Sequence, residues 1–122
     1  MIVFGIVPRR AVKLPNVDHA RIERAKILDY LLAVDHPEGA GKAIFFVRFG
    51  FAITNWETFA DALIAHARLY QVTKMSESKF GAKYQIDGPL PCPDGRSPVI
   101  RAVWIVDAGT DFPRLITAHP LA

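Results

Sequence analysis

The hydrophobic periodicity of the chain changes once, near Tyr70, and this change limits the folds that the chain can adopt. Before it, apolar residues recur three and four positions apart, which is typical of helices; between residues 56 and 69 they are Trp56, Phe59, Ala60, Leu63, Ile64 and Ala67. After it, apolar and polar residues alternate in short runs separated by turns, which is typical of strands. No helical stretch separates these runs, so we expect an α+β fold with N-terminal helices packed on a four-stranded antiparallel sheet.

Three helical segments are expected before Tyr70. The first begins at Asp18, which can cap a helix, and ends near Val34, because the residue before Pro37 is disfavoured in the α region. The second covers residues 42–48. The third begins at the segment 54–57, Thr-Asn-Trp-Glu, whose first and last side chains can form a capping box. The strands are expected at residues 70–74, 83–86, 99–106 and 114–119.

The length of 122 residues indicates one domain, which we place at residues 13–122 after an N-terminal arm, residues 1–12. The net charge of +3 comes from the N-terminus, since residues 1–13 hold Arg9, Arg10 and Lys13 without an acid. The apolar start, residues 1–7, favours a strand or a tucked arm over a signal peptide. The single cysteine, Cys92, excludes an internal disulfide, does not support a zinc site, and indicates a reducing compartment such as the cytoplasm. No apolar stretch is long enough to span a membrane.

The strand at residues 99–106 contains one charged residue among apolar ones, Arg101. In the last strand, Leu115, Thr117 and His119 are expected on one side, with Ile116 and Ala118 on the other. If these two strands are neighbours, Arg101, Thr117 and His119 converge on one patch of the sheet. In the alternative, Arg101 pairs with a surface carboxylate and His119 frays at the terminus.

Two further pairs of residues are candidates for a site. Lys83 and Tyr84 point to opposite sides of their strand, so at most one joins the patch; the alternatives are a solvated lysine and a half-buried tyrosine. His36 and Lys42 flank a glycine turn before a helix, where free amides and a basic side chain suit a phosphate. That turn can also serve only as a helix entrance, and it lacks the nucleotide-binding pattern that ends in Gly-Lys-Ser/Thr.

Several segments together resemble an uncharacterised bacterial domain family, a domain of unknown function that is similar in layout to the Barnase, EndoU, Colicin and RelE group of ribonuclease toxins. The segments, within residues 13–120, are Leu14-Pro15-Asn16, Asp29-Tyr30-Leu31-Leu32, His36-Pro37 with Gly41-Lys42-Ala43, Lys83-Tyr84, Pro93-Asp94-Gly95-Arg96, Val103-Trp104-Ile105 and the stretch 113–120. The resemblance implies an RNA site on the sheet face. Members of the group usually end in Thr-x-Tyr-Pro, and here His119 replaces the tyrosine, which either adds a proton-transfer group or only packs.

The resemblance implies a metal-independent endoribonuclease toxin of a toxin-antitoxin or polymorphic toxin system, which needs no cofactor and cleaves RNA, such as tRNA or mRNA, to a 2′,3′-cyclic phosphate. The expected roles are proton transfer by His119 or His36, charge stabilisation by Arg101 with Lys42 or Lys83, a hydrogen bond from Thr117, and stacking of a base on Tyr84 or Trp104. Arg101→Ala is expected to abolish activity and leave the fold intact. An antitoxin or immunity protein is the expected partner.

The alternative function is a non-catalytic interaction module, such as an antitoxin, immunity or regulatory partner, or an accessory protein with a dead site. In that case the two-sided apolar strand and the Phe-rich segment 45–51 serve core and interface packing.

Overall fold

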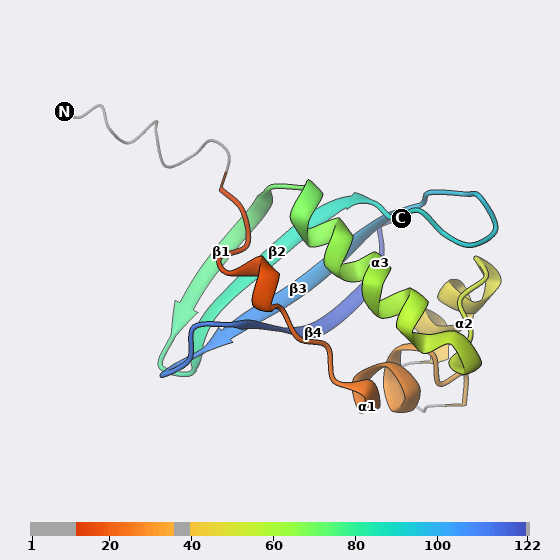
Figure 1. Ribbon diagram of the computed structural model, residues 1–122, viewed down its shortest axis with the longest axis horizontal. Helices are drawn as coiled ribbons and strands as arrows, with labels where there is room; N and C mark the ends of the chain where they lie inside the picture. The colour runs from red at the N-terminus through yellow and green to blue at the C-terminus, as the bar shows by residue number, and fades with distance from the viewer. Residues whose placement is uncertain (1–11, 36–39, 122) are drawn as a thin grey trace.

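The computed structural model describes residues 12–35 and 40–121, so the expectations for residues 1–11 and for His36 lie outside it. Its centre is a four-stranded antiparallel sheet with the strands in sequence order, β1-β2-β3-β4 (Figure 1). This confirms the predicted α+β class and the antiparallel sheet, and it adds the strand order, which the sequence analysis left open. All four strands are longer than the runs expected from the sequence: β1 is Val72–Ser78, β2 is Gly81–Pro89, β3 is Val99–Asp107 and β4 is Pro113–Pro120.

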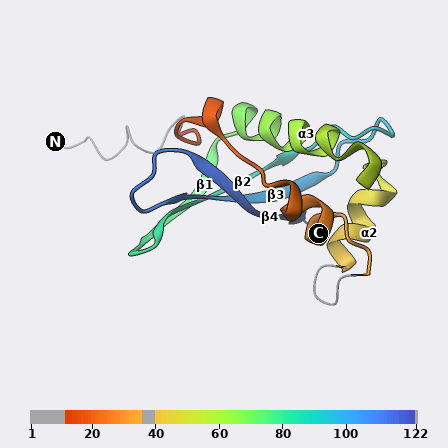
Figure 2. The same cartoon turned by 60° about the horizontal axis from the view of Figure 1, so that its bottom comes forward.

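The sheet has one covered face and one open face. The helix α3 (Trp56–Leu69) crosses one face, called here the core face, and no described helix crosses the middle of the other, called here the open face (Figure 2). The alternation in β2 follows this difference, because Tyr84 and Ile86 are buried whereas Lys83 and Gln85 are not. Side chains that alternate along a strand therefore separate a hydrophobic core from an accessible polar surface.

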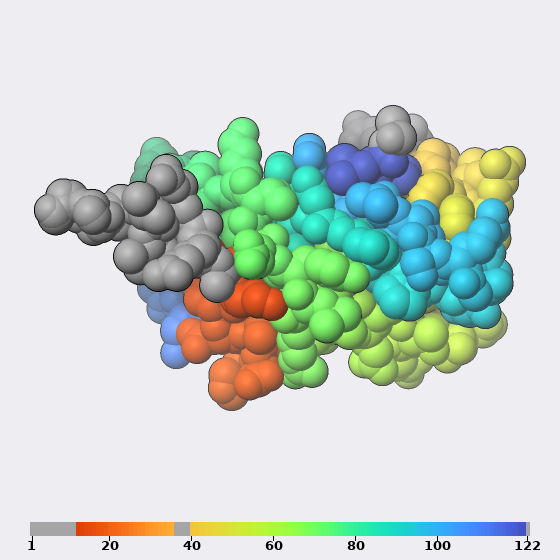
Figure 3. Space-filling model, turned by 90° about the horizontal axis from the view of Figure 1, so that it is seen from above, coloured from red at the N-terminus to blue at the C-terminus, as the bar shows by residue number. Residues whose placement is uncertain are grey.

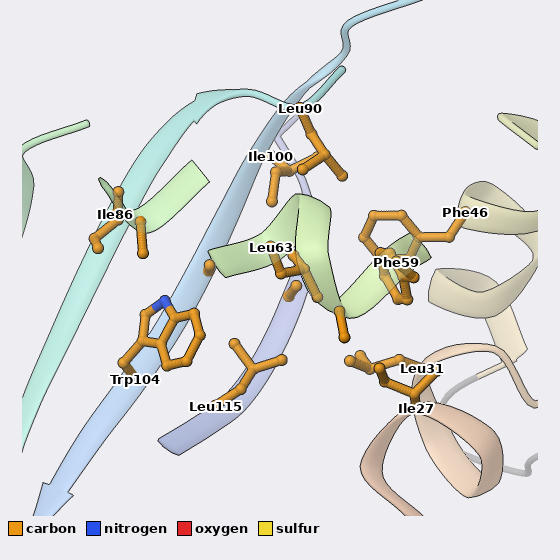
Figure 4. Packing of buried hydrophobic residues seen from close by; sticks show 14 of the residues in the cluster. Ile27, Leu31, Phe46, Phe59, Leu63, Ile86, Leu90, Ile100, Trp104 and Leu115 are labelled. Atoms are coloured by element: carbon orange, nitrogen blue, oxygen red, sulfur yellow. The ribbon is translucent and has the colours of Figure 1, made fainter. Parts of the chain in front are cut away.

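The core lies between the sheet and the helices. Leu63 and Phe59 of α3 point into it, Trp104 of β3 covers the sheet side, and Phe46 of α2 (Ala40–Arg48) closes one end (Figure 4). The rings of Phe46 and Phe59 lie 4.8 Å apart, centroid to centroid. The short helix expected at residues 42–48 is thus confirmed, and it packs at the end of the sheet rather than over its middle.

The prediction of one helix from Asp18 to Val34 is wrong. The chain forms the 3-10 turn η2 (Val17–His19), then an extended stretch, then the short α1 (Arg24–Lys26), which continues into the π-helical η3 (Ile27–Leu31). In the extended stretch, the Arg21 amide donates to the Pro113 carbonyl, and the Leu115 amide donates to the Arg21 carbonyl. These two bonds pair backbone groups on the free edge of β4. Their formation outweighs the helical preference of the segment.

The predicted capping box is also absent. The chain enters α3 through the 3-10 turn η4 (Ile53–Asn55), and the residue before the helix, Asn55, makes no capping hydrogen bond with its side chain. The apolar face expected for α3 is nevertheless present, since Phe59, Ala60, Leu63 and Ala67 are buried. Hydrophobic burial therefore decides where this helix lies, and its start is set by the preceding turn.

One irregularity in β4 changes which side chains share a face. Thr117 lies opposite Val103, but Leu115 lies opposite Trp104, so β4 has one extra residue at Ile116. This bulge turns Leu115 to the core face, where it is 3% exposed, and leaves Thr117 on the open face. The expectation that Leu115 shares a side with Thr117 and His119 is therefore wrong.

Candidate functional site

Arg101 and His119 lie on neighbouring strands and are directly opposite each other in the register of β3 and β4. Side chains of directly opposed residues project from the same face of a sheet. Thr117, two residues before His119, lies opposite Val103 on the same side. The structure thus brings Arg101, Thr117 and His119 to the open face, as expected if β3 and β4 are neighbours.

Lys42 reaches this patch from α2. Its Nζ donates to the hydroxyl oxygen of Tyr30, at 2.9 Å, and to Oγ1 of Thr117, at 3.2 Å. The ammonium also lies 5.2 Å from the centre of the Tyr30 ring. Among the described residues, no carboxylate forms an ion pair with Lys42. A cation held by two hydroxyl groups keeps its charge available for an anion.

A shallow pocket opens beside this lysine. It is lined by Gly41, Lys42, His119 and Pro120 and has a volume of about 530 Å³; it is called here the Lys42 pocket. The dark-blue C-terminal end of the chain lies near the yellow to orange α2 in the space-filling view (Figure 3). The pocket therefore joins a cation from the helical half to an imidazole from the last strand.

Tyr30 of η3 is a member of the site that the sequence analysis did not select. The hydrogen bond from Lys42 lowers the pKa of its phenol, and the charge of Lys42 and contact with Thr117 act in the same direction against partial burial. The only available signal for Tyr30 was its place in one of the segments that carry the family resemblance.

The imidazole of His119 is oriented by its own strand end. Its Nδ1 lies 3.1 Å from the carbonyl oxygen of Pro120, which can only accept a hydrogen bond. Nδ1 is therefore the protonated nitrogen of the neutral ring, and Nε2 carries the lone pair. A neutral His119 in this tautomer presents a base.

Arg101 has a partner of its own on β2. Its Nε and Nη2 donate to the two carboxylate oxygens of Asp87, at 2.8 and 3.0 Å, and this hydrogen bonding raises the pKa of Arg101. The alternative in which Arg101 pairs with a surface carboxylate is therefore what the structure shows. His119 does not fray, because it lies within β4. Since the ion pair uses Nε and Nη2, the N–H groups of Nη1 are left for another acceptor.

The remaining candidates lie elsewhere. Lys83 is on the open face, but it is four residues from Asp87 along β2, roughly 13 Å. Tyr84 and Trp104 are on the core face, 9% and 0% exposed, so neither ring is open to a base in this structure. Their burial has a simple cause, since both belong to the hydrophobic core on the covered face of the sheet.

Other reactive groups do not extend the site. Burial raises the pKa of the Cys92 thiol to about 11, with Asp94 adding to the effect, so this cysteine is a poor nucleophile at neutral pH. Within residues 12–35 and 40–121, no three His, Cys, Asp or Glu side chains gather closely enough to hold a metal ion. None of the helices in these two ranges has the length and apolar character needed to cross a bilayer.

Comparisons with known proteins place this architecture. Residues 13–122 match the family model described as "Domain of unknown function (DUF6883)". A chain of the solved structure "Contact-dependent growth inhibition toxin - immunity protein complex from Klebsiella pneumoniae 342" shares the fold with a TM-score of 0.65. The two chains are 19% identical, and the similarity covers 82% of this chain and 98% of the other. No curated protein matches the sequence.

Proposed function

The chain belongs to the DUF6883 family, and from the geometry of its open face we propose that it is a metal-independent endoribonuclease of the bacterial toxin kind. The single observation that carries the proposal is the Lys42 pocket. There an ammonium without a carboxylate partner among the described residues, a hydroxyl group and an imidazole come together on an accessible sheet face. The resemblance to ribonuclease toxins, and a fold shared with a chain from a toxin and immunity protein complex, support it.

The proposed reaction uses the nucleophile that RNA itself carries. Nε2 of His119 removes the proton of a 2′-hydroxyl group, and the 2′-oxygen attacks the adjacent phosphorus. The bond from phosphorus to the 5′-oxygen breaks, that oxygen takes a proton from water, and His119 releases the proton it gained to water. The products are a 2′,3′-cyclic phosphate and a 5′-hydroxyl end.

Lys42 and Thr117 act on the phosphoryl oxygens in this reaction. Negative charge builds on these oxygens in the transition state, and a preorganised cation or hydroxyl donor stabilises it. Tyr30 and Thr117 hold the Lys42 ammonium at the pocket, so Tyr30 is a positioning residue. Arg101 is placed to add a donor through Nη1 while Asp87 holds its other edge.

Cleavage of RNA in the presence of a chelator tests the proposal. The purified chain is incubated with total RNA and EDTA, and the fragments are examined for 2′,3′-cyclic phosphate ends. His119→Ala is expected to reduce cleavage by on the order of 100-fold or more, since acid-base groups contribute 10²–10⁴ in rate. His19→Ala is the matched control, because His19 lies in the 3-10 turn η2, outside the residues that line the Lys42 pocket.

Two results would overturn the ribonuclease assignment. One is the absence of RNA fragments from a well-folded sample that also fails to arrest growth on expression. The other is cleavage that the His119 and Lys42 variants leave unchanged, because this would place the activity elsewhere or in a contaminant.

A second candidate function is a binding module for a partner protein, such as an immunity protein or antitoxin. A specific observation favours it: an apolar pocket of about 300 Å³ at the helical end of the molecule, lined by Leu32, Val34, Val47, Phe51, Ala52, Ile53 and Thr54. Val34 and Ile53 are each 50% exposed there. Of the Phe-rich segment 45–51, Phe46 and Phe51 are buried in the core. Val34→Asp is expected to weaken partner binding without affecting RNA cleavage, which separates the two functions.

A further inference from the structure

A second polar pocket lies on the open face, over β1 and β2. We propose that Lys74 and Lys83 form an anion site there that binds a backbone phosphate of the RNA strand away from the scissile bond. This inference rests on the proposed function for the identity of its ligand. It gives Lys83 a binding role in place of the catalytic role considered from the sequence.

The register of β1 and β2 builds this pocket. Lys74 lies opposite Gln85, and Ser76 lies opposite Lys83. These four side chains and Val103 line a hollow of about 130 Å³, called here the Lys83 pocket. Lys74 and Lys83 are diagonal neighbours across the two strands, a relation that places their backbones roughly 7–8 Å apart. The two ammonium groups can therefore reach one phosphate together.

The charge of this part of the sheet is uncompensated. The strands contain three acids, and Glu77 lies opposite Ala82, on the other side of the sheet from Lys83. The remaining two, Asp87 and Asp107, are each held by two hydrogen bonds from an arginine, Arg101 and Arg114 respectively. Among the described residues, no acid pairs with Lys74 or Lys83. Two neighbouring like charges repel each other, and a bound anion relieves this repulsion.

The uncharged groups of the pocket suit a phosphate as well. Ser76 supplies a hydroxyl donor. The Gln85 Nε2 donates to Oγ1 of Thr73, at 3.2 Å, and that hydroxyl donates to the Gln85 carbonyl oxygen, at 3.1 Å, so the Gln85 side chain is anchored. Ammonium and hydroxyl donors without a nearby unpaired carboxylate are the chemistry of backbone contacts to nucleic acid.

The Lys83 pocket and the Lys42 pocket lie on the same side of the sheet. Lys83 and Asp87 are four residues apart on β2, and Asp87 lies opposite Arg101, which lies opposite His119. Four residues along a strand and two strands across place Lys83 roughly 16 Å from His119. A single RNA strand laid across the open face would contact both pockets and pass Arg101 between them.

Binding of a non-cleavable RNA tests this site independently of catalysis. The probe is a fluorescent 2′-O-methyl oligonucleotide of about ten nucleotides, which lacks the attacking hydroxyl group, and anisotropy is measured over a range of salt concentrations. The double variant Lys74→Gln, Lys83→Gln is expected to bind roughly tenfold more weakly. Its slope of log affinity against log salt should fall by about 0.7, because the two lysines contact one phosphate and each single-strand phosphate contact contributes about 0.7.

Lys79→Gln is the matched control, because Lys79 lies in the turn between β1 and β2 and makes a cation contact with the Phe80 ring. It is expected to bind like the wild type. The effect of the double variant should also vanish for a dinucleotide, which is too short to contact both pockets. Equal affinity of the double variant and the wild type for the longer probe overturns the site, as does an equal loss with Lys79→Gln.

The outcome separates this site from the ribonuclease proposal. If the double variant weakens RNA binding while no cleavage is found, the anion site stands and the catalytic proposal fails. If cleavage is found and the double variant binds RNA like the wild type, the catalytic proposal stands and the anion site fails. If the chain binds no RNA and instead captures an acidic partner protein through these lysines, the phosphate site is refuted.

Discussion

Nζ of Lys42 lies 3.2 Å from Oγ1 of Thr117, although the two residues are 75 positions apart in the chain. This hydrogen bond links α2 to the open side of β4 and holds the Lys42 ammonium, which lines the Lys42 pocket. It matters for the proposed function because, among the described residues, the hydrogen-bond partners of this ammonium are two uncharged groups, the hydroxyls of Thr117 and Tyr30. The packing of α2 against β4 therefore places an ammonium group where an anion could bind it.

Removing the Lys42 ammonium should cost activity and little stability. In Lys42→Met the aliphatic stem is retained and the charge is lost, so we expect RNA cleavage to fall by on the order of 100-fold. The hydrogen bonds of Lys42 to Tyr30 and Thr117 are only partly buried, so the unfolding free energy should change by less than about 1.5 kcal/mol. Cleavage rates and urea unfolding measure the two effects. Lys26→Met is the control, because Lys26 contacts the Tyr30 ring but does not line the pocket.

Arg101→Ala should abolish or strongly reduce cleavage while the chain stays folded. The ion pair with Asp87 is partly exposed, with side chains 32% and 21% accessible, so solvent screening leaves it a small contribution to the free energy of unfolding. Asp87→Asn tests the role of the ion pair separately, because it removes the negative charge of the partner and leaves the Arg101 guanidinium in place. If the free guanidinium is what activity requires, Asp87→Asn retains cleavage. A folded, fully active Arg101→Ala variant would remove Arg101 from the site.

His66 should make the stability of the fold depend on pH. Burial lowers the pKa of this imidazole below its ordinary value of 6.5, against opposing effects of a hydrogen bond to the Gly88 carbonyl and of Asp87. Below about pH 6.5 the unfolded chain takes up a proton that the folded chain does not, so the unfolding free energy should fall as the pH is lowered through that value towards the folded pKa. Above about pH 6.5 the imidazole is neutral in both states, so the unfolding free energy no longer depends on pH through His66.

The matched variant for this effect is His66→Gln, which keeps an amide donor for the Gly88 carbonyl and removes the titrating group. The difference in unfolding free energy between this variant and the wild type should shrink as the pH falls from 7 to 5, because only the wild type loses the contribution of a neutral imidazole. Chemical unfolding at several pH values measures this difference. A difference that stays constant over this pH range would show that the pKa of His66 is the same in the folded and unfolded states.

Gly88 should be intolerant of even one added methyl group. A Cβ at this position would lie 2.6 Å from Cδ2 of the Tyr70 ring, which packs on the glycine. Gly88→Ala must displace that ring, so we expect a loss of about 1–3 kcal/mol in unfolding free energy. Gly41→Ala is the control, since a Cβ there meets no atom within 4 Å. It should be neutral or stabilising by about 0.5–1 kcal/mol, as expected for a helical position.

The sequence predicted the sheet well and the first helix poorly, for one physical reason. Alternation along a strand is a local pattern, and residues an odd number apart, such as Arg101 and Trp104, lie on opposite faces of β3 as it requires. The segment 18–34 carries an equally clear helical period, yet Arg21 is extended and pairs with the edge of β4. A hydrogen bond to a distant strand is invisible to a local pattern, so it overrode the prediction.

The site was anticipated only in part. The expected convergence of Arg101, Thr117 and His119 followed from residue parity alone. The bulge at Ile116 did not, and without it either Leu115 or Thr117 would face the wrong side. The sequence left open that Arg101 pairs with a surface carboxylate, but it did not identify Asp87, because this pairing depends on the register of β2 against β3.

The amino-acid sequence by itself determined the fold class, the order of the strands along the chain and the alternation of polar and apolar side chains. Those properties follow from hydrophobic period and turn chemistry, which act over a few residues. Only the tertiary structure decided that Lys42 and Tyr30 reach Thr117, that Asp87 occupies one edge of Arg101, and that Trp104 is closed to a ligand. These relations depend on how α2 docks on β4 and on strand register, and both are set by packing between residues tens of positions apart.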